Sequence, residues 1–195
     1  MTTEPTATPL PPTATTEPAA AAEPTPTLLP TPDTLTLLDF NDEREAVNWF
    51  LVNDTVMGGV STSGGAIEDG VLNFYGDLSL DNNGGFTSVR RAFSESIDGY
   101  AGIRLRVLGD GRSYYLRLRD NSTGREVEHE VLFETTEGEW RTIDLPFEAF
   151  VANFRGFPID HPPLDTTQLR AISFMLREKN PGAFALQVDS IEAYR

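Results

Sequence analysis

The stretch AGIRLRVLG, residues 101–109, alternates apolar residues and arginines without interruption from Ile103 to Val107. Successive side chains of a strand point to opposite faces, so the two arginines share one face and the apolar residues share the other. The next segment, SYYLRLRD at residues 113–120, repeats this alternation. Two such segments separated by glycine and aspartate predict half-buried, consecutive strands of an antiparallel sheet.

Segments rich in Val, Ile, Phe, Tyr and Leu recur along the chain and are mostly separated by Gly, Asp, Asn or Pro. The ten strand candidates are LTLLDF, NWFLV, GVLNFYG, FTSVRRAF, AGIRLRVLG, SYYLRLRD, VEHEVLFE, WRTIDLPF, LRAISFML and FALQVDSIEAY. A helical turn is favoured only at residues 146–154, PFEAFVANF. The pattern predicts an all-β fold, an antiparallel β-sandwich or jelly roll in which each sheet has one solvated face.

Residues 1–33 differ in composition from the rest of the chain. They hold nine prolines and ten threonines but no aromatic residue, lysine or arginine. Such a segment buries too little apolar surface to offset the loss of chain entropy, so we expect a disordered linker or stalk before one folded domain at residues 34–195. Met1 is followed by polar residues, so we expect a bacterial cell-surface or secreted location if a signal peptide lies upstream, and a cytoplasmic one otherwise.

The net charge of −15 and the absence of cysteine exclude several classes of function. An acidic protein repels phosphate backbones, which argues against a nucleic-acid partner, and no apolar run is long enough for direct membrane insertion. Cysteine-ligated zinc and thiol catalysis are excluded, and His129 and His161 lack metal-ligand spacing. P-loop, GxGxxG and GxSxG motifs are missing, so we predict that the protein is not an enzyme and needs no cofactor.

Several long motifs resemble one known family in the same order along the chain. They are WFLVNDTVMGGVSTS, GDLSLDNNGGFTSVRRAF, WRTIDLPFEAF and FMLREKNPGAFALQVDSIEAY. Together they resemble the domain of complex I intermediate-associated protein 30, and the resemblance covers approximately residues 35–195. It implies a galactose-binding-like jelly roll.

The resemblance also implies a role. Mitochondrial members of the family assist the assembly of respiratory complex I, so a non-catalytic, chaperone-like assembly factor with a protein partner is the leading expectation. The alternative, from another class of function, is a carbohydrate-binding module at the cell surface, with a glycan as its ligand.

Three turn-rich segments, residues 53–59, 81–86 and 177–181, each combine amide or carboxylate side chains with glycine or proline. Loops that join the sheets of a jelly roll gather at its ends, so we predict that these segments converge on one binding surface close to Trp49. The residues assigned to this surface are Asp54, Met57, Asn82, Asn83, Arg90, Glu178, Lys179 and Asn180.

A structural interpretation competes with this binding surface. The three segments are then unrelated turns, and their polar side chains bond only to their own backbone. In this interpretation Gly58, Gly59, Gly84 and Gly85 supply the positive φ angles that tight turns require.

Four arginines alternate with apolar residues on two consecutive strand candidates and are expected to point outward. They are Arg104, Arg106, Arg117 and Arg119. Guanidinium groups bind carboxylates in a planar, bidentate manner, and Tyr115 adds an aromatic ring, so this face suits an acidic peptide or a glycan. The alternative is a cross-strand ladder of the arginines with Glu128 and Glu130 on the next strand.

A structural calcium ion is considered near Asp39 and Asp189, where the resemblance brings the first and last strands together. In FALQVDSIEAY the apolar positions change parity, which predicts a β-bulge at Asp189 and Ser190. Two carboxylates are too few to specify a calcium site, so no metal ligand is assigned.

Overall fold

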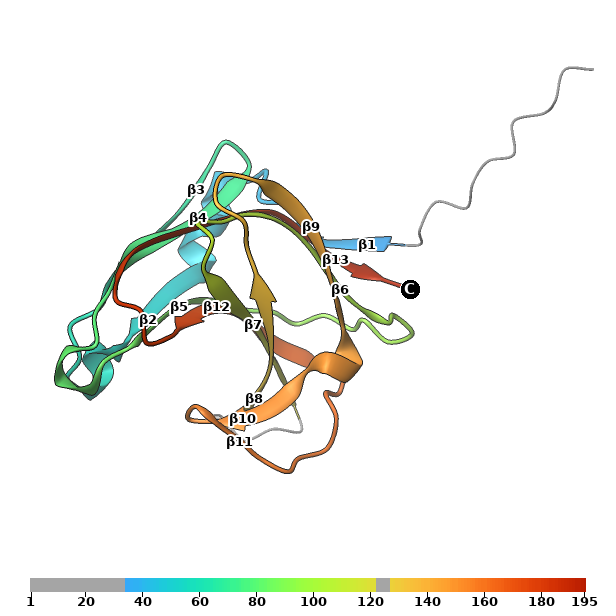
Figure 1. Ribbon diagram of the computed structural model, residues 1–195. Coiled ribbons are helices and arrows are strands. Elements are labelled where there is room, and N and C mark those ends of the chain that lie inside the picture. Colours follow the sequence, from blue (N-terminus) through green and yellow to red (C-terminus); the bar gives the residue numbers. More distant parts are fainter. Residues whose placement is uncertain (1–33, 122–126) are drawn as a thin grey trace, which may run out of the picture. The chain divides into compact units, whose positions relative to one another are not determined.

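The computed structural model describes residues 34–121 and 127–195, which form two antiparallel β-sheets packed face to face (Figure 1). The predicted disordered segment, residues 1–33, lies outside the described residues. In chain order the elements are β1 (Thr34–Leu38), η1 (Glu43–Asn48), β2 (Trp49–Asn53), η2 (Asp54–Met57), β3 (Thr62–Glu68), β4 (Val71–Leu78), η3 (Asp81–Asn83), β5 (Phe86–Ala92), β6 (Gly102–Leu108), β7 (Ser113–Asp120), β8 (Val127–Glu134), β9 (Trp140–Pro146), η4 (Phe147–Ala149), β10 (Val151–Phe154), β11 (Phe157–Pro158), β12 (Leu169–Arg177) and β13 (Gly182–Tyr194), where η denotes a 3₁₀ turn.

The first sheet has the strand order β3-β4-β13-β6-β9, and β1 pairs with the C-terminal part of β13. The second sheet has the order β11-β10-β8-β7-β12-β5-β2. Because neighbours in each sheet come from distant parts of the chain, the connections cross repeatedly between the two layers. The prediction of an all-β, antiparallel sandwich of the jelly-roll kind is confirmed.

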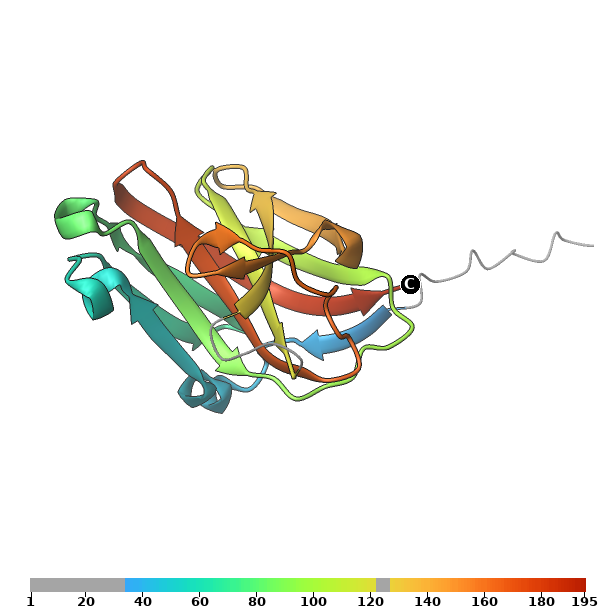
Figure 2. The same ribbon diagram turned by 90° about the horizontal axis from the view of Figure 1, so that it is seen from below.

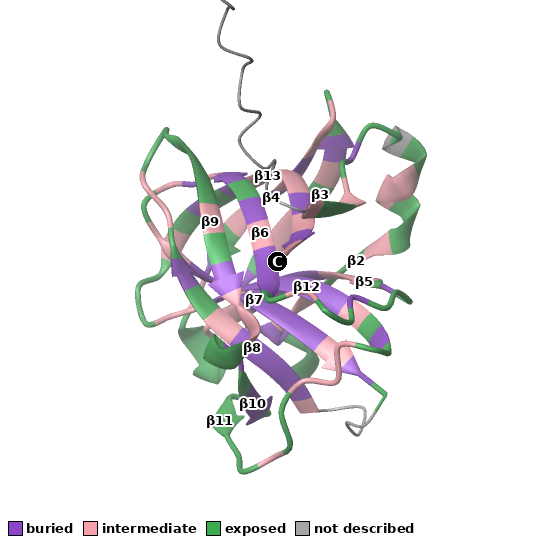
Figure 3. Cartoon of the chain, turned by 90° about the vertical axis from the view of Figure 1, so that its right-hand side faces the viewer, coloured by how far each residue is buried: buried purple, intermediate pink, exposed green. Residues whose placement is uncertain are grey.

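The core lies between the two sheets and is built from the apolar side of each alternating strand. Leu105 in β6 faces inward from the first sheet, while Leu116 and Phe174 face inward from the second, and all three are 0% exposed. Figure 3 shows the alternation of buried and more exposed residues along β6. Burial of the apolar faces is therefore what selects the outward direction of the arginines.

The two arginine-bearing strands lie in different sheets, contrary to the prediction of one shared face. Strand β6 belongs to the first sheet and β7 to the second, because the connection at residues 109–112 passes from one layer to the other. Gly111, with φ of 86°, allows this tight passage. Arg104 and Arg106 thus face outward on the first sheet, and Arg117 and Arg119 on the second.

All ten strand candidates correspond to strands, and the 3₁₀ turn η4 lies in the segment predicted as a helical turn. Sequence patterns missed β3, β10 and β11. Strand β3 contains Gly64 and Gly65, which favour a loop, and the ring of Tyr75 on β4 packs over Gly64, where a Cβ would lie 2.6 Å from it. Strands β10 and β11 are too short to show a period.

The register of β13 shifts between Val188 and Ser190, which confirms the predicted bulge. The carboxylate of Asp189 faces Arg106 at 3.2 Å, and Asp39 accepts a hydrogen bond from the backbone of Asn41. No group of three or more His, Asp or Glu residues suited to a metal ion occurs in the described part of the chain. Across residues 34–121 and 127–195, no helix is long and apolar enough to cross a membrane.

Candidate binding site

The three segments predicted to converge lie at one end of the sandwich, where η2, η3 and the β12–β13 connection are neighbours (Figures 1 and 2). Asp54 joins the first two segments, because its carboxylate accepts hydrogen bonds from the backbone N–H groups of Ser61 at 2.9 Å and Gly85 at 2.7 Å. The third segment is brought close by the pairing of Arg177 in β12 with Phe86 in β5.

Asp54 itself is 0% exposed, so the prediction that it lies on a polar rim is wrong. The hydroxyl of Ser61 also donates to it, at 2.5 Å. Burial opposes the charged form, but the hydrogen bonds from Ser61, Gly85 and Phe86 outweigh burial and lower the pKa of Asp54 below its ordinary value. The carboxylate therefore acts as an internal clamp that ties η2 to the loop before β5.

Glycines surround this clamp for two physical reasons. Gly58 and Gly85 have φ angles of 93° and 123°, which side chains with a Cβ rarely adopt. Gly59 and Gly84 do not have positive φ, contrary to the prediction. At these two positions a Cβ atom would lie 2.4 Å and 2.6 Å from carboxylate atoms of Asp54, so only glycine leaves room for the clamp.

The polar residues of the β12–β13 connection are directed elsewhere. Glu178 forms an ion pair with Arg112 in the β6–β7 connection, and the backbone oxygen of Asn180 accepts a hydrogen bond from the same guanidinium at 2.7 Å. Lys179 is exposed. This corner is therefore held by a local ion pair.

The two asparagines of η3 adopt the backbone conformation that its turn requires. Asn82 and Asn83 are exposed and have left-handed φ angles of 56° and 61°, which asparagine tolerates better than most residues. Of the residues assigned from sequence, the structure brings Met57 and Arg90 together, because both line one groove on the second sheet.

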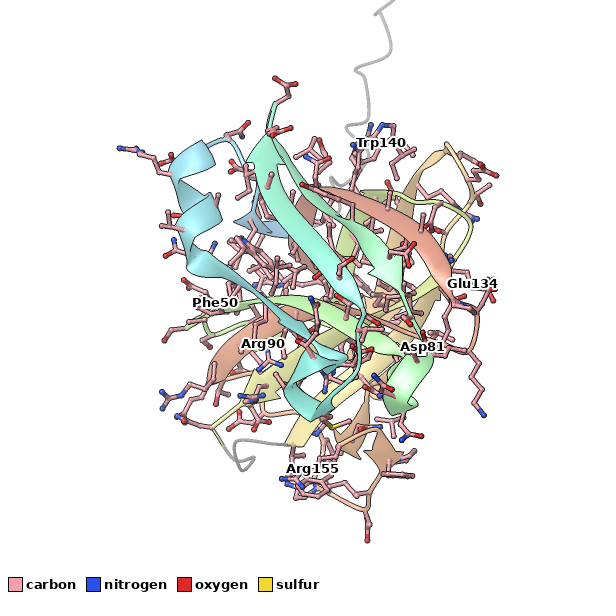
Figure 4. All side chains as sticks on the ribbon, turned by 90° about the vertical axis from the view of Figure 1, so that its left-hand side faces the viewer. Phe50, Asp81, Arg90, Glu134, Trp140 and Arg155 are labelled. Carbon is pink, nitrogen blue, oxygen red and sulfur yellow. The ribbon has the colours of Figure 1, made fainter. Side chains whose placement is uncertain are left out.

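This groove, which we call the arginine groove, has a volume of about 530 Å³ and lies on the outward face of the second sheet. It extends between η2 and the β10–β11 turn, and Figure 4 labels Arg90 and Arg155 within it. Its lining residues are Val52, Val56, Met57, Phe86, Arg90, Arg117, Arg119, Glu128, Arg155, Gly156, Met175 and Arg177.

Short polar side chains separate the arginines along the outward face of this sheet. The register across β5, β12 and β7 places Arg90, Ser173 and Arg117 in one row. Ser88 lies two residues before Arg90 on β5, and both serines are almost fully buried.

Two glutamates on β8 are enclosed by arginines at this floor. Nη2 of Arg177 donates to Glu130 at 2.8 Å, and Nε of Arg117 lies 2.8 Å from Glu128, which also pairs with Arg119. Burial lowers the pKa of Arg117 from its ordinary value, and the two glutamates partly oppose this effect. The predicted ladder with Glu128 and Glu130 is confirmed for Arg117 and Arg119. It is wrong for Arg104 and Arg106, which lie on the other sheet and pair with Asp144 and Asp189.

Arginine is in excess among the described lining residues of the groove, which include five arginines and one glutamate, Glu128. Arg90 forms no ion pair or hydrogen bond with any part of the chain that the structure describes, and its Nε is buried without a partner. A local excess of positive charge on a protein with a net charge of −15 is a feature that random surface composition does not explain.

The walls of the groove are apolar and exposed. Val56 and Met57 in η2, which line the groove, are each 70% exposed. Phe86 is the aromatic residue among its described lining residues. The guanidinium carbon of Arg177 lies 4.5 Å from the centre of the Tyr115 ring, which is not one of them. The groove therefore combines an apolar wall with a cationic floor.

Sequence reasoning missed Arg155, Met175 and Arg177 as groove residues. The signal for the last two was present, because residues 171, 173, 175 and 177 share the outward parity of β12 while residues 172, 174 and 176 are apolar and buried. Arg155 lies in the turn between two strands that are too short to predict, so its position has no sequence signature.

Comparison with models of protein families shows the family to which the chain belongs. A family model described as Complex I intermediate-associated protein 30 (CIA30) matches residues 38–188. The chain belongs to the CIA30 family. No curated protein matches this CIA30 chain significantly in sequence.

Solved structures resemble the CIA30 chain in fold. The family 11 carbohydrate-binding module from Clostridium thermocellum, in complex with a beta-1,3-1,4-mixed-linked tetrasaccharide, has a TM-score of 0.64 and 17% identity, over 83% of this chain and 95% of that one. The agarase AgWH50C has a TM-score of 0.59 and 12% identity, over 83% of this chain but 24% of the agarase. At these identities the likeness establishes the jelly-roll fold alone.

Proposed function

We propose that this CIA30 protein is a non-catalytic binding module whose arginine groove takes up a segment of a partner protein, as a chaperone-like assembly factor requires. The observation that carries the proposal is the joining of exposed aliphatic walls and an arginine floor in one groove. Methionine and arginine are enriched in protein–protein interfaces, and the flexible side chain of Met57 can adapt to partners of different shape.

The ion pairs of the groove support a binding role over a hydrolytic one. Glycoside hydrolysis requires two carboxyl groups that flank the scissile bond of the substrate. Glu128 and Glu130 instead each have an arginine within ion-pair distance, so both carboxylates are already engaged by the protein itself.

Carbohydrate binding at a cell surface is the second candidate. It is favoured by the fold that the chain shares with the family 11 module, whose structure holds a tetrasaccharide. Sugar recognition depends strongly on open aromatic faces, however, and Phe86 is the one aromatic side chain among the described lining residues of the groove. The exposed groove residues Val56 and Met57 are aliphatic, which suits protein side chains better.

Site-specific photo-crosslinking tests the proposal. Benzoylphenylalanine is placed at Met57 in the groove and, as a matched control, at Tyr75, which is 51% exposed on the first sheet. We expect irradiation in the native cell to give one protein adduct from position 57 that position 75 does not give. Equal adducts from both positions, or no adduct together with binding of mixed-linked glucan in an affinity gel, would contradict the protein-binding role.

A further inference from the structure

Arg90 differs from every other arginine at the floor of the groove. Arg117, Arg119 and Arg177 each have a glutamate from β8 within ion-pair distance. Arg90 lies on β5, and Ser173 on β12 separates it from Arg117 in the same row. Neighbouring strands lie about 4.8 Å apart, so Arg90 is two strand spacings from Arg117 and three from β8. The β8 glutamates are therefore out of its direct reach.

An unpaired guanidinium at this place is energetically unfavourable in the absence of a ligand. Its Nε is shielded from solvent and has no hydrogen-bond partner. A buried donor left unsatisfied destabilises the fold, and more so when the group is charged. Neighbouring Arg117 adds like-charge repulsion, because Arg90 contributes to lowering the pKa of Arg117. An anion bound at Arg90 would relieve both effects.

We infer that Arg90 receives a carboxylate of the partner, and that the segment bound in the groove is an acidic one in which aspartate or glutamate adjoins apolar residues. The inference rests on the proposed function, because it names the chemistry of the ligand in the same groove. Charge complementarity selects the acid, since the guanidinium fork matches a carboxylate in a bidentate manner.

The apolar walls of the groove determine which residues are expected next to the acidic residue of the bound segment. Val52 and Val56 both line the groove with Arg90, and Val52 pairs with Ser88 on the same strand β5. Met57 continues this apolar wall along η2. A carboxylate held by Arg90 therefore places the next side chains of an extended segment against aliphatic surface.

Selection from a random peptide library reads out the ligand chemistry directly. A phage-displayed library of 12-residue peptides is panned on the full chain, on Arg90→Gln and on Arg141→Gln. Arg141 is an exposed arginine on β9 of the first sheet and serves as the matched control. We expect the wild type and the Arg141 variant to enrich peptides that contain Asp or Glu beside apolar residues, and the Arg90 variant to lose this enrichment.

A double-mutant cycle then assigns the contact. The best peptide is synthesised with its acid or with the isosteric amide, and binding to wild type and Arg90→Gln is measured. Removing either partner is expected to weaken binding about 10- to 100-fold, and removing both should weaken it no further. Additive losses, or enrichment of peptides without acidic residues, would overturn the inference.

The same experiment separates this inference from the proposed function. Substitution of the exposed Met57 by Asp alters the wall without touching the core. Acid-free peptides that depend on Met57 would refute the carboxylate but retain protein binding. Peptides whose binding does not depend on Met57 would refute both the carboxylate at Arg90 and protein binding in the groove. Displacement of the peptide by oligogalacturonate, with higher affinity than the peptide, would identify the ligand as an acidic glycan instead of a protein segment.

Discussion

The outward faces of the two sheets carry the same arginine pattern but organise its charge differently. On the first sheet each arginine has its own partner: Arg104 forms two hydrogen bonds with Asp144, at 2.6 and 2.8 Å, and Arg106 lies 3.2 Å from Asp189. The side chain of Arg106 is 52% exposed. Charge on this face is balanced pair by pair and remains in contact with water.

On the second sheet the arginines are packed together. The side chain of Arg117 is 8% exposed, and it shares Glu128 with Arg119 and Glu130 with Arg177. Arg90 adds a guanidinium that none of the glutamates described by the structure reaches. The difference teaches that an alternating pattern fixes the direction of a side chain, while the residues on neighbouring strands decide whether the resulting face is a neutral ladder or a binding site.

The largest loss of stability is expected when the Asp54 clamp, which ties down the η2 wall of the groove, is removed. Asp54→Ala leaves the buried donors of Ser61 and Gly85 unpaired, each at about 1–3 kcal/mol, so we expect it to lower the free energy of unfolding by about 4 kcal/mol. Chemical denaturation measures this loss. Asp77→Ala, at an exposed carboxylate on the first sheet, is the control and should change stability by less than about 0.5 kcal/mol.

The pH dependence of this clamp has a defined sign. The pKa of Asp54 is lower in the folded state than its ordinary value of 3.8, so the clamp contributes fully above pH 3.8 and is lost as pH falls through the folded pKa. The stability difference between wild type and Asp54→Asn should therefore be constant near neutral pH and shrink below 3.8. A difference that grows on acidification would contradict the hydrogen-bonded carboxylate.

A smaller loss is expected from Gly59→Ala. Its new Cβ would lie 2.4 Å from the carboxylate carbon of Asp54, so the clamp must shift, and overpacking of this kind costs about 1–3 kcal/mol. Gly65→Ala is the matched control, because its Cβ meets nothing closer than 3.6 Å. Thermal unfolding should show a lower midpoint for the first variant only; equal midpoints would show that the loop adapts freely.

The two faces are compared directly by Arg117→Met and Arg104→Met. The first removes a buried guanidinium shared by Glu128 and Glu130, and we expect a loss of about 2 kcal/mol. The second removes a solvent-exposed pair with Asp144, for which less than about 1 kcal/mol is expected. Urea unfolding in low and high salt measures both. Equal losses would remove the distinction between a packed cluster and an exposed ladder.

The smallest loss of stability is expected for Arg90→Met, which should show none. Arg90 has no ion pair to lose within the described chain, and its replacement by an apolar side chain of similar length removes an unsatisfied buried Nε, so the free energy of unfolding should stay at the wild-type value or rise by about 1 kcal/mol. Denaturant midpoints test this. A loss as large as that of Arg117→Met would assign Arg90 to the architecture of the sheet.

Local periodicity was sufficient to predict most of the fold. Alternating apolar residues identified ten strands, and the parity change at Asp189 and Ser190 identified a bulge. Periodicity does not report the sheet to which a strand belongs, so β6 and β7 were expected on one face. It also failed at Gly64, where a glycine that normally favours a loop lies under the ring of Tyr75 on the adjacent strand.

The candidate site was predicted in part. Met57 and Arg90 were assigned from sequence and do line the groove. Asp54 was assigned to the surface because an acid beside paired glycines resembles an exposed turn. Its inward direction depends on donors at Ser61 and Gly85 that are distant in sequence, and no local pattern reports such contacts.

Arginine side-chain NMR tests the central claim most directly, because it observes both faces in one sample. The Nε–Hε signals of the full chain are assigned by single substitutions and followed while an acidic peptide from the phage selection is added. The account predicts a saturable shift of the Arg90 signal, with the signals of Arg104 and Arg106 on the first sheet unchanged. Shifts of Arg104 and Arg106 with Arg90 unchanged would place binding on the wrong face and contradict it.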